Sequence, residues 1–148
     1  MAASPLLRSG ILGMRSPEGE AQHGPNASLE GLRVLLVEDS WQVADALKLL
    51  LEKLGMIVSG PVATVAEAQA LAADARPSLA IVDVNLKGEM AYGLLDWLNR
   101  QQIEVIVISG YADLPRSLRQ FAPILHKPFT ATALITTLRR IADRLPRR

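Results

Sequence analysis

The chain has 148 residues, of which 49% are hydrophobic and 21% charged, as is typical of one globular domain. A formal net charge of +1 gives no reason to expect nucleic acid or an anionic membrane as a partner. The absence of cysteine excludes disulfides, thiolate metal sites and a cysteine nucleophile, and no apolar run approaches the roughly 18 residues of a membrane span. We therefore expect a cytoplasmic protein without a membrane anchor.

The two ends of the chain differ in composition from the middle. Residues 1–31 are rich in Gly, Pro, Ser and Ala without a hydrophobic period, so we expect a flexible N-terminal tail. Regular patterns then run over residues 32–145, which we expect to form a single domain. After Asp143 only a few, mostly basic, residues remain. We therefore expect no output domain and no direct binding of DNA.

The first half of this domain alternates strand and helix twice. Residues 32–37 are a short apolar, β-branched run, typical of a buried parallel strand. Ser40 is the expected N-cap of the helix that follows. Residues 56–59 predict a second strand, closed by Gly60–Pro61, and a capping box over Thr64–Glu67 begins a second helix.

The second half continues the alternation. The predicted elements are a strand at 79–84, a helix at 91–100, a strand at 103–108, a helix at 113–120, a strand at 123–126 and a last helix capped by Thr130. The strand at 79–84 is the most apolar and carries Asp83 near its end. Pro115 lies inside the fourth helix, which we therefore expect to be short or irregular.

Five strand–helix units in alternation predict an α/β fold, a five-stranded parallel sheet with helices on both faces of the flavodoxin-like kind. In such sheets the ligand lies beyond the carboxyl ends of the strands. The residues at those ends are therefore the candidates for chemistry.

Those ends carry Glu38 and Asp39 after the first strand, Asp83 on the third, Ser109 after the fourth and Lys127 after the fifth. Three carboxylates in one cleft repel one another, and a hard cation such as Mg²⁺ relieves the repulsion and also bridges to phosphate. The lysine adds a positive charge for a carboxylate or phosphoryl oxygen.

Each of these features also has an ordinary structural explanation when it is taken alone. The acidic pair can belong to a helix N-terminus, Asp83 can accept loop hydrogen bonds, Ser109–Gly110 can be a turn, and Lys127 can be a surface lysine. All of them together at the strand ends of one fold favour a functional site.

Four motifs carry a resemblance to a known family: VLLVEDS over Val34–Ser40, IVDVNL over Ile81–Leu86, IVISG over Ile106–Gly110 and HKPF over His126–Phe129. Together they resemble the receiver domain of bacterial response regulators, and the match runs from about Leu32 to Arg140.

The resemblance implies a role for each site residue. Asp83 would be the phosphoacceptor. Asp39 and Asp83 would bind Mg²⁺ directly, with the backbone carbonyl of Asn85 as a third protein ligand, and Glu38 would act through a metal-bound water. Ser109 and Lys127 would contact the phosphoryl group, and the bond from Lys127 to Pro128 would be cis.

The chain departs from the commonest receivers at the fifth strand. Their aromatic switch residue lies two positions before the lysine, where this chain has Leu125, whereas Tyr111 follows Ser109 by two positions. This resembles the alphaproteobacterial stand-alone receivers called the FATGUY family, and it implies Ser109 and Tyr111 as the switch. Alternatively, Tyr111 is a loop aromatic packed on the surface. Trp41 is either a partner contact or an edge-of-core residue.

The resemblance implies a single-domain response regulator that takes its phosphoryl group from a histidine kinase or a histidine phosphotransferase. It would relay phosphate or bind a downstream target protein, as a monomer or weak homodimer, and would catalyse only its own phosphorylation and dephosphorylation. A small phosphatase of the haloacid-dehalogenase kind is a rival, but those enzymes usually need an aspartate where this chain has Asn85. A degenerate receiver that only binds proteins is a third hypothesis.

Overall fold

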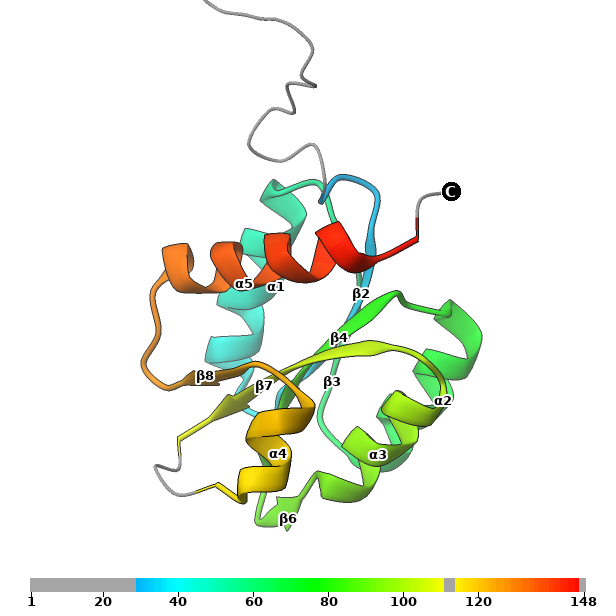
Figure 1. Cartoon of the computed structure of the whole chain (residues 1–148), viewed down its shortest axis with the longest axis vertical. Helices are drawn as coiled ribbons and strands as arrows, with labels where there is room; N and C mark the ends of the chain where they lie inside the picture. The colour runs from blue at the N-terminus through cyan, green and yellow to red at the C-terminus, as the bar shows by residue number, and fades with distance from the viewer. Residues whose placement is uncertain (1–28, 111–113, 147–148) are drawn as a thin grey trace, which may run out of the picture.

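Five parallel strands form one sheet in the order β3-β2-β4-β7-β8, which confirms the predicted fold class. The computed structural model describes residues 29–110 and 114–146 (Figure 1). The strands are β2 Arg33–Val37, β3 Ile57–Val62, β4 Leu79–Asp83, β7 Glu104–Ser109 and β8 Ile124–His126. Because all five run in the same direction, their carboxyl ends share one edge of the sheet.

Helices cover both faces of this sheet. The helices are α1 Trp41–Lys53, α2 Val65–Ala75, α3 Tyr92–Arg100, α4 Arg116–Phe121 and α5 Ala131–Arg144. Figure 1 shows α1 and α5 on one face, with α2, α3 and α4 on the other. The fourth helix has only six residues and begins directly after Pro115, as the proline in this segment predicted.

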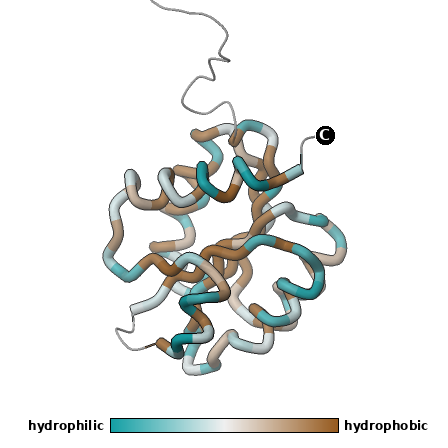
Figure 2. Tube along the Cα trace, viewed as in Figure 1, coloured by the Kyte–Doolittle hydropathy of each residue, from teal (hydrophilic) through white to brown (hydrophobic). Residues whose placement is uncertain are grey.

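The strands form because their apolar side chains alternate between two separate cores. In β4 every residue is buried; Leu79 and Ile81 pack with α1 and α5, whereas Ala80 and Val82 pack with α2 and α3. The hydrophobic colouring of Figure 2 is therefore concentrated on the central strands. Burial of each leucine or isoleucine side chain stabilises the fold by about 1.5–3 kcal/mol.

All three predicted N-cap residues occupy the N-cap positions of their helices, and two of them cap through their side chains. The side chain of Thr64 accepts a hydrogen bond from the Glu67 N–H, and the side chain of Thr130 accepts one from the Ala133 N–H. Ser40 is the N-cap residue of α1 as predicted, but its side chain makes no cap hydrogen bond. Its backbone N–H instead donates to Glu38 Oε2 at 3.1 Å, so the turn before α1 is arranged around a buried carboxylate.

Gly60–Pro61 does not close the second strand as predicted, because β3 continues through it to Val62. An edge strand tolerates a proline, since one side of its backbone needs no partner, and β3 is an edge strand. A Cβ atom at position 60 would lie 2.6 Å from the carbonyl oxygen of Leu36, so only glycine fits there. The packed part of the chain also reaches back to Leu29, which is fully buried.

Two short antiparallel strands, β5 Asn85–Leu86 and β6 Glu89–Met90, were not predicted. They lie between β4 and α3, where the polar, glycine-containing sequence gave no strand period. Tyr111 and Asp113 lie outside the described residues. Within the described part of the chain, no helix has both the length and the apolar character needed to cross a bilayer.

Candidate functional site

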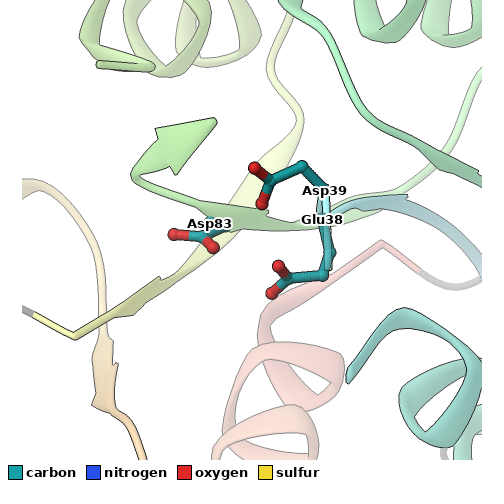
Figure 3. Close-up of side chains that lie close together, drawn as sticks. All are labelled: Glu38, Asp39 and Asp83. Carbon is teal, nitrogen blue, oxygen red and sulfur yellow. The ribbon is translucent and has the colours of Figure 1, made fainter. Parts of the chain in front are cut away.

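Three carboxylates meet at the carboxyl edge of the sheet. Glu38 and Asp39 follow β2, and Asp83 ends β4, the neighbouring strand. One oxygen of each can be chosen so that all three lie within 4.8 Å of one another. Figure 3 shows the three carboxylate groups directed to the same side of the sheet edge, and Glu38 and Asp83 are buried.

Lys127 supplies the positive charge of this cluster. Its Nζ lies 3.0 Å from Asp83 Oδ2 and 3.2 Å from Glu38 Oε1, so one ammonium bridges the ends of β2 and β4. Burial alone would lower the pKa of Lys127, but the hydrogen bond to Asp83 and the neighbouring carboxylate of Glu38 outweigh burial and raise that pKa above its ordinary value. Lys127 is therefore a fixed cation beside Asp83.

The burial of Glu38 disfavours the charged form of its carboxylate. Burial raises its pKa to about 7, and the nearby charge of Asp83 adds to this, whereas the Ser40 N–H and Lys127 act in the opposite direction. The contact of Glu38 Oε1 with Lys127 is an ion pair by distance. Among the described residues, however, no group donates a well-directed hydrogen bond to this buried oxygen.

Backbone N–H groups hold the two aspartates. The Asn85 N–H donates to Asp83 Oδ1 at 3.0 Å, and the Lys87 N–H donates to Asp39 Oδ2 at 2.8 Å. Lys87 was not among the sequence-predicted site residues. No residue type marks it, because it acts through its backbone; the Lys87–Gly88 dipeptide of a tight turn was the only available signal.

Ser109 lies at the same edge. It ends β7, one residue beyond the pair formed by Asp83 and Ile108, and it is fully buried. Its carbonyl oxygen accepts a hydrogen bond of 2.8 Å from the Lys127 N–H, and the peptide bond from Lys127 to Pro128 is cis as predicted. The fold therefore gathers Glu38, Asp39, Asp83, Asn85, Ser109 and Lys127, whereas Tyr111 lies outside the described residues.

These residues fit a divalent cation. The donor set is all oxygen, which suits Mg²⁺. The buried Glu38 Oε1 receives no well-directed hydrogen bond from the described residues, and burial raises the pKa of Glu38. A cation held by Asp39 and Asp83 would favour the charged form of this carboxylate. The geometry thus defines an α/β domain with an acidic, metal-compatible site at the carboxyl edge of its sheet.

The comparisons identify the family. The response regulator receiver domain matches residues 34–139, and the chain belongs to this family of signalling modules in two-component phosphorelays. The predicted resemblance to receivers is confirmed. No curated protein matches the chain significantly.

Solved structures agree with the family. The receiver domain of a LuxO repressor protein from Vibrio parahaemolyticus is 31% identical, covers 77% of this chain and 92% of its own, and has a TM-score of 0.67. SdrG from Sphingomonas melonis Fr1 is 32% identical, covers 75% and 96%, and has a TM-score of 0.67. A CheY-like receiver from Methanospirillum hungatei JF-1 is 27% identical, covers 77% and 95%, and has a TM-score of 0.70. The FATGUY subfamily stays a prediction.

Proposed function

We propose that this chain is a single-domain response regulator that accepts a phosphoryl group on Asp83. One observation carries the proposal: Lys127 Nζ lies 3.0 Å from Asp83 Oδ2 inside a cluster of three carboxylates. A lysine fixed beside a buried aspartate at the carboxyl edge of a parallel sheet can neutralise an incoming phosphoryl oxygen. In the receiver family this position is the phosphorylation site.

The reaction proposed for Asp83 is an in-line displacement. A carboxylate oxygen of Asp83 attacks the phosphorus of a phosphohistidine on a histidine kinase or a histidine phosphotransferase. A phosphorus–oxygen bond forms while the phosphorus–nitrogen bond of the donor breaks, and its electron pair stays on the imidazole ring. The transition state is loose, so its equatorial oxygens need fixed positive partners.

Lys127 and Ser109 are proposed to contact the transferred group. Lys127 donates to a phosphoryl oxygen, and the Ser109 hydroxyl donates to another. Bound Mg²⁺ would supply further positive charge to the same oxygens. Asp39, Asp83 and the Asn85 carbonyl are the proposed ligands, with Glu38 acting through a water molecule.

The output is proposed to come from protein partners. Ser109 moves toward the new phosphoryl charge and Tyr111 follows it, which changes the surface offered to a downstream target. We assign residues 32–145 to the receiver, with the buried Leu29 packed against it, and we assign the protein to the cytoplasm as a monomer or weak homodimer.

Incubation with acetyl phosphate and Mg²⁺, followed by intact-mass measurement, tests the assignment. We expect one phosphoryl group on the wild type and none on Asp83→Asn. Asp74→Asn, an exposed aspartate on α2, is the matched control and is labelled normally. A label that persists on Asp83→Asn contradicts the assignment. SdrG has a solved beryllofluoride-activated conformation at 32% identity, so we also expect beryllofluoride to bind here.

The same experiment separates the two alternatives. Repeated turnover of free phosphate esters would support a phosphatase, although the family match and Asn85 give that hypothesis no support. A wild type that takes no label from acetyl phosphate or from a phosphorylated histidine kinase would favour a degenerate receiver.

A further inference from the structure

The β5–β6 hairpin, residues 85–90, contacts the site without contributing an acidic or basic side chain to it. Its strands pair Asn85 with Met90 and Leu86 with Glu89, which leaves a two-residue turn of Lys87 and Gly88. Both turn residues have left-handed backbone, with φ of 53° and 85°. This is the pattern of a type I′ turn, and a lysine rarely adopts it.

The hairpin holds carboxylates from two different strand ends. At its start, the Asn85 N–H donates to Asp83 Oδ1 at 3.0 Å. At its tip, the Lys87 N–H donates to Asp39 Oδ2 at 2.8 Å, across 48 residues of sequence. One short segment therefore sets the orientation of Asp39 relative to Asp83.

Three further contacts hold the hairpin in place. The Gly88 N–H donates to the side-chain oxygen of Asn85 at 2.8 Å, which closes the turn. Leu86 is 2% exposed and anchors the hairpin in the core beneath α3. The Ala91 N–H donates to the Val84 carbonyl at 2.7 Å and fixes the base. The Lys87 N–H cannot move independently of these contacts.

We propose that the Lys87 N–H is a positioning group that orients the Asp39 carboxylate and gives the site its preference for Mg²⁺ over Ca²⁺. The inference rests on the proposed function, in which Asp39 is a metal ligand. Mg²⁺ requires near-ideal octahedral geometry, whereas Ca²⁺ accepts flexible geometry, so a loosened Asp39 penalises Mg²⁺ more. Loss of a hydrogen bond that orients a metal ligand typically weakens binding by about 10- to 100-fold.

Gly88→Val tests the inference. Valine strains the left-handed backbone at position 88, and no atom lies within 4 Å of the added Cβ, so the change acts on the turn and not on packing. We expect the Kd for Mg²⁺, measured by calorimetry, to rise about tenfold and the Kd for Ca²⁺ to change by less than about twofold. Gly88→Asn should recover most of the Mg²⁺ affinity, because asparagine tolerates left-handed backbone.

Gly93→Ala is the matched control. Gly93 lies in α3 with ordinary backbone and open space around it, and this variant should bind Mg²⁺ as the wild type does. Hydrogen exchange of the Lys87 amide in metal-free protein gives a second readout. We expect this amide to be protected in the wild type and in Gly88→Asn, and to exchange fast in Gly88→Val.

Either of two results overturns the inference: an unchanged Mg²⁺ Kd in Gly88→Val, or equal weakening of Mg²⁺ and Ca²⁺ binding. If the valine variant does not fold, Gly88→Ala applies a milder strain and the same comparison of ions decides. A wild type that binds no Mg²⁺ contradicts the proposed function and this inference together. If the wild type binds Mg²⁺ and Gly88→Val binds it with the same Kd, only the inference about Lys87 is contradicted.

Discussion

The N-terminal ends of α1 and α2 use a glutamate in opposite ways. In the first turn of α2, the exposed carboxylate of Glu67 supports the helix start, because it accepts from the Ala63 N–H at 3.2 Å and from the Thr64 hydroxyl at 3.1 Å. Before α1 the relation is reversed. The backbone N–H of Ser40, the residue before the helix, donates to the buried carboxylate of Glu38 at 3.1 Å. The side-chain cap hydrogen bond is therefore absent from α1, the helix that follows the carboxylate cluster at the end of β2.

The first helical residue shows the same difference. Val65, which begins α2, packs against the core on that face of the sheet. Trp41, which begins α1, has 72% of its surface exposed. The start of α2 is therefore built for stability, whereas the start of α1 is built around the carboxylate cluster. Changes at the two helix starts should accordingly affect different properties.

Replacement of Lys127, which pairs with Glu38 just before α1, should have the largest effect, and that effect is on the rate of phosphorylation. Lys127→Met leaves Glu38 and Asp83 without their shared cation and removes the proposed donor to a phosphoryl oxygen. We expect phosphorylation by acetyl phosphate to slow by about 100-fold, the usual effect of losing one donor to a transition-state oxygen. Arg100→Met is the control, because it breaks only an exposed ion pair in α3. Equal rates in the two variants would contradict the role of Lys127.

Mg²⁺ binding should depend on pH through Glu38. Its pKa is raised to about 7, so the metal-free site takes up a proton below that pH, and a cation must displace it. The Kd for Mg²⁺ should therefore rise by up to about tenfold per pH unit as the pH falls below 7, and flatten above it. Calorimetry at several pH values measures this slope. Glu38→Gln should reduce the slope, whereas the exposed Glu52→Gln should not.

The same shift has a definite sign for stability. Because folding raises the Glu38 pKa from 4.5, its contribution in metal-free protein is fully present below that pH and is lost as the pH rises through about 7. Urea unfolding at pH 5 and pH 8 should show this loss in the wild type and less of it in Glu38→Gln. A loss of equal size in Glu38→Gln would mean that another group is responsible.

The two helix caps give a smaller and purely structural contrast. Thr64→Ala should lower the free energy of unfolding by about 1 kcal/mol, because it removes the acceptor of the Glu67 N–H. Ser40→Ala should change that free energy by less than about 0.5 kcal/mol, because no side-chain cap exists there. Urea unfolding of both variants measures the difference. Similar losses of unfolding free energy at both positions would show that the Ser40 side chain caps α1 as the Thr64 side chain caps α2.

The sequence was sufficient to predict the fold and which side chains meet at the carboxyl edge of the sheet. Strand ends are set by buried apolar runs such as residues 79–83, and parallel strands deliver their ends to one edge. On that ground the sequence alone predicts that Glu38, Asp83 and Lys127 lie together, as the structure has them. Thr64 and Thr130 were predictable as caps because a cap is a local interaction within one turn.

The missed features depend on partners that are distant in the sequence or on the backbone. The Lys87 N–H reaches Asp39 across 48 residues, and an N–H group leaves no mark on residue identity. The continuation of β3 through Gly60–Pro61 likewise depends on its place at the edge of the sheet.

Replacement of Trp41 should have the smallest effect on the free energy of unfolding. One hypothesis from the sequence made it an edge-of-core residue, and an exposure of 72% contradicts that hypothesis and leaves the partner contact. Trp41→Ala should therefore change the free energy of unfolding by less than about 0.5 kcal/mol, as exposed positions do. Labelling by acetyl phosphate should be unchanged, whereas transfer from a phosphorylated histidine kinase should slow. Equal transfer rates in Trp41→Ala and the wild type would contradict the hypothesis that Trp41 contacts the kinase. Trp41 would then be an exposed residue at the start of α1 without a role in phosphotransfer.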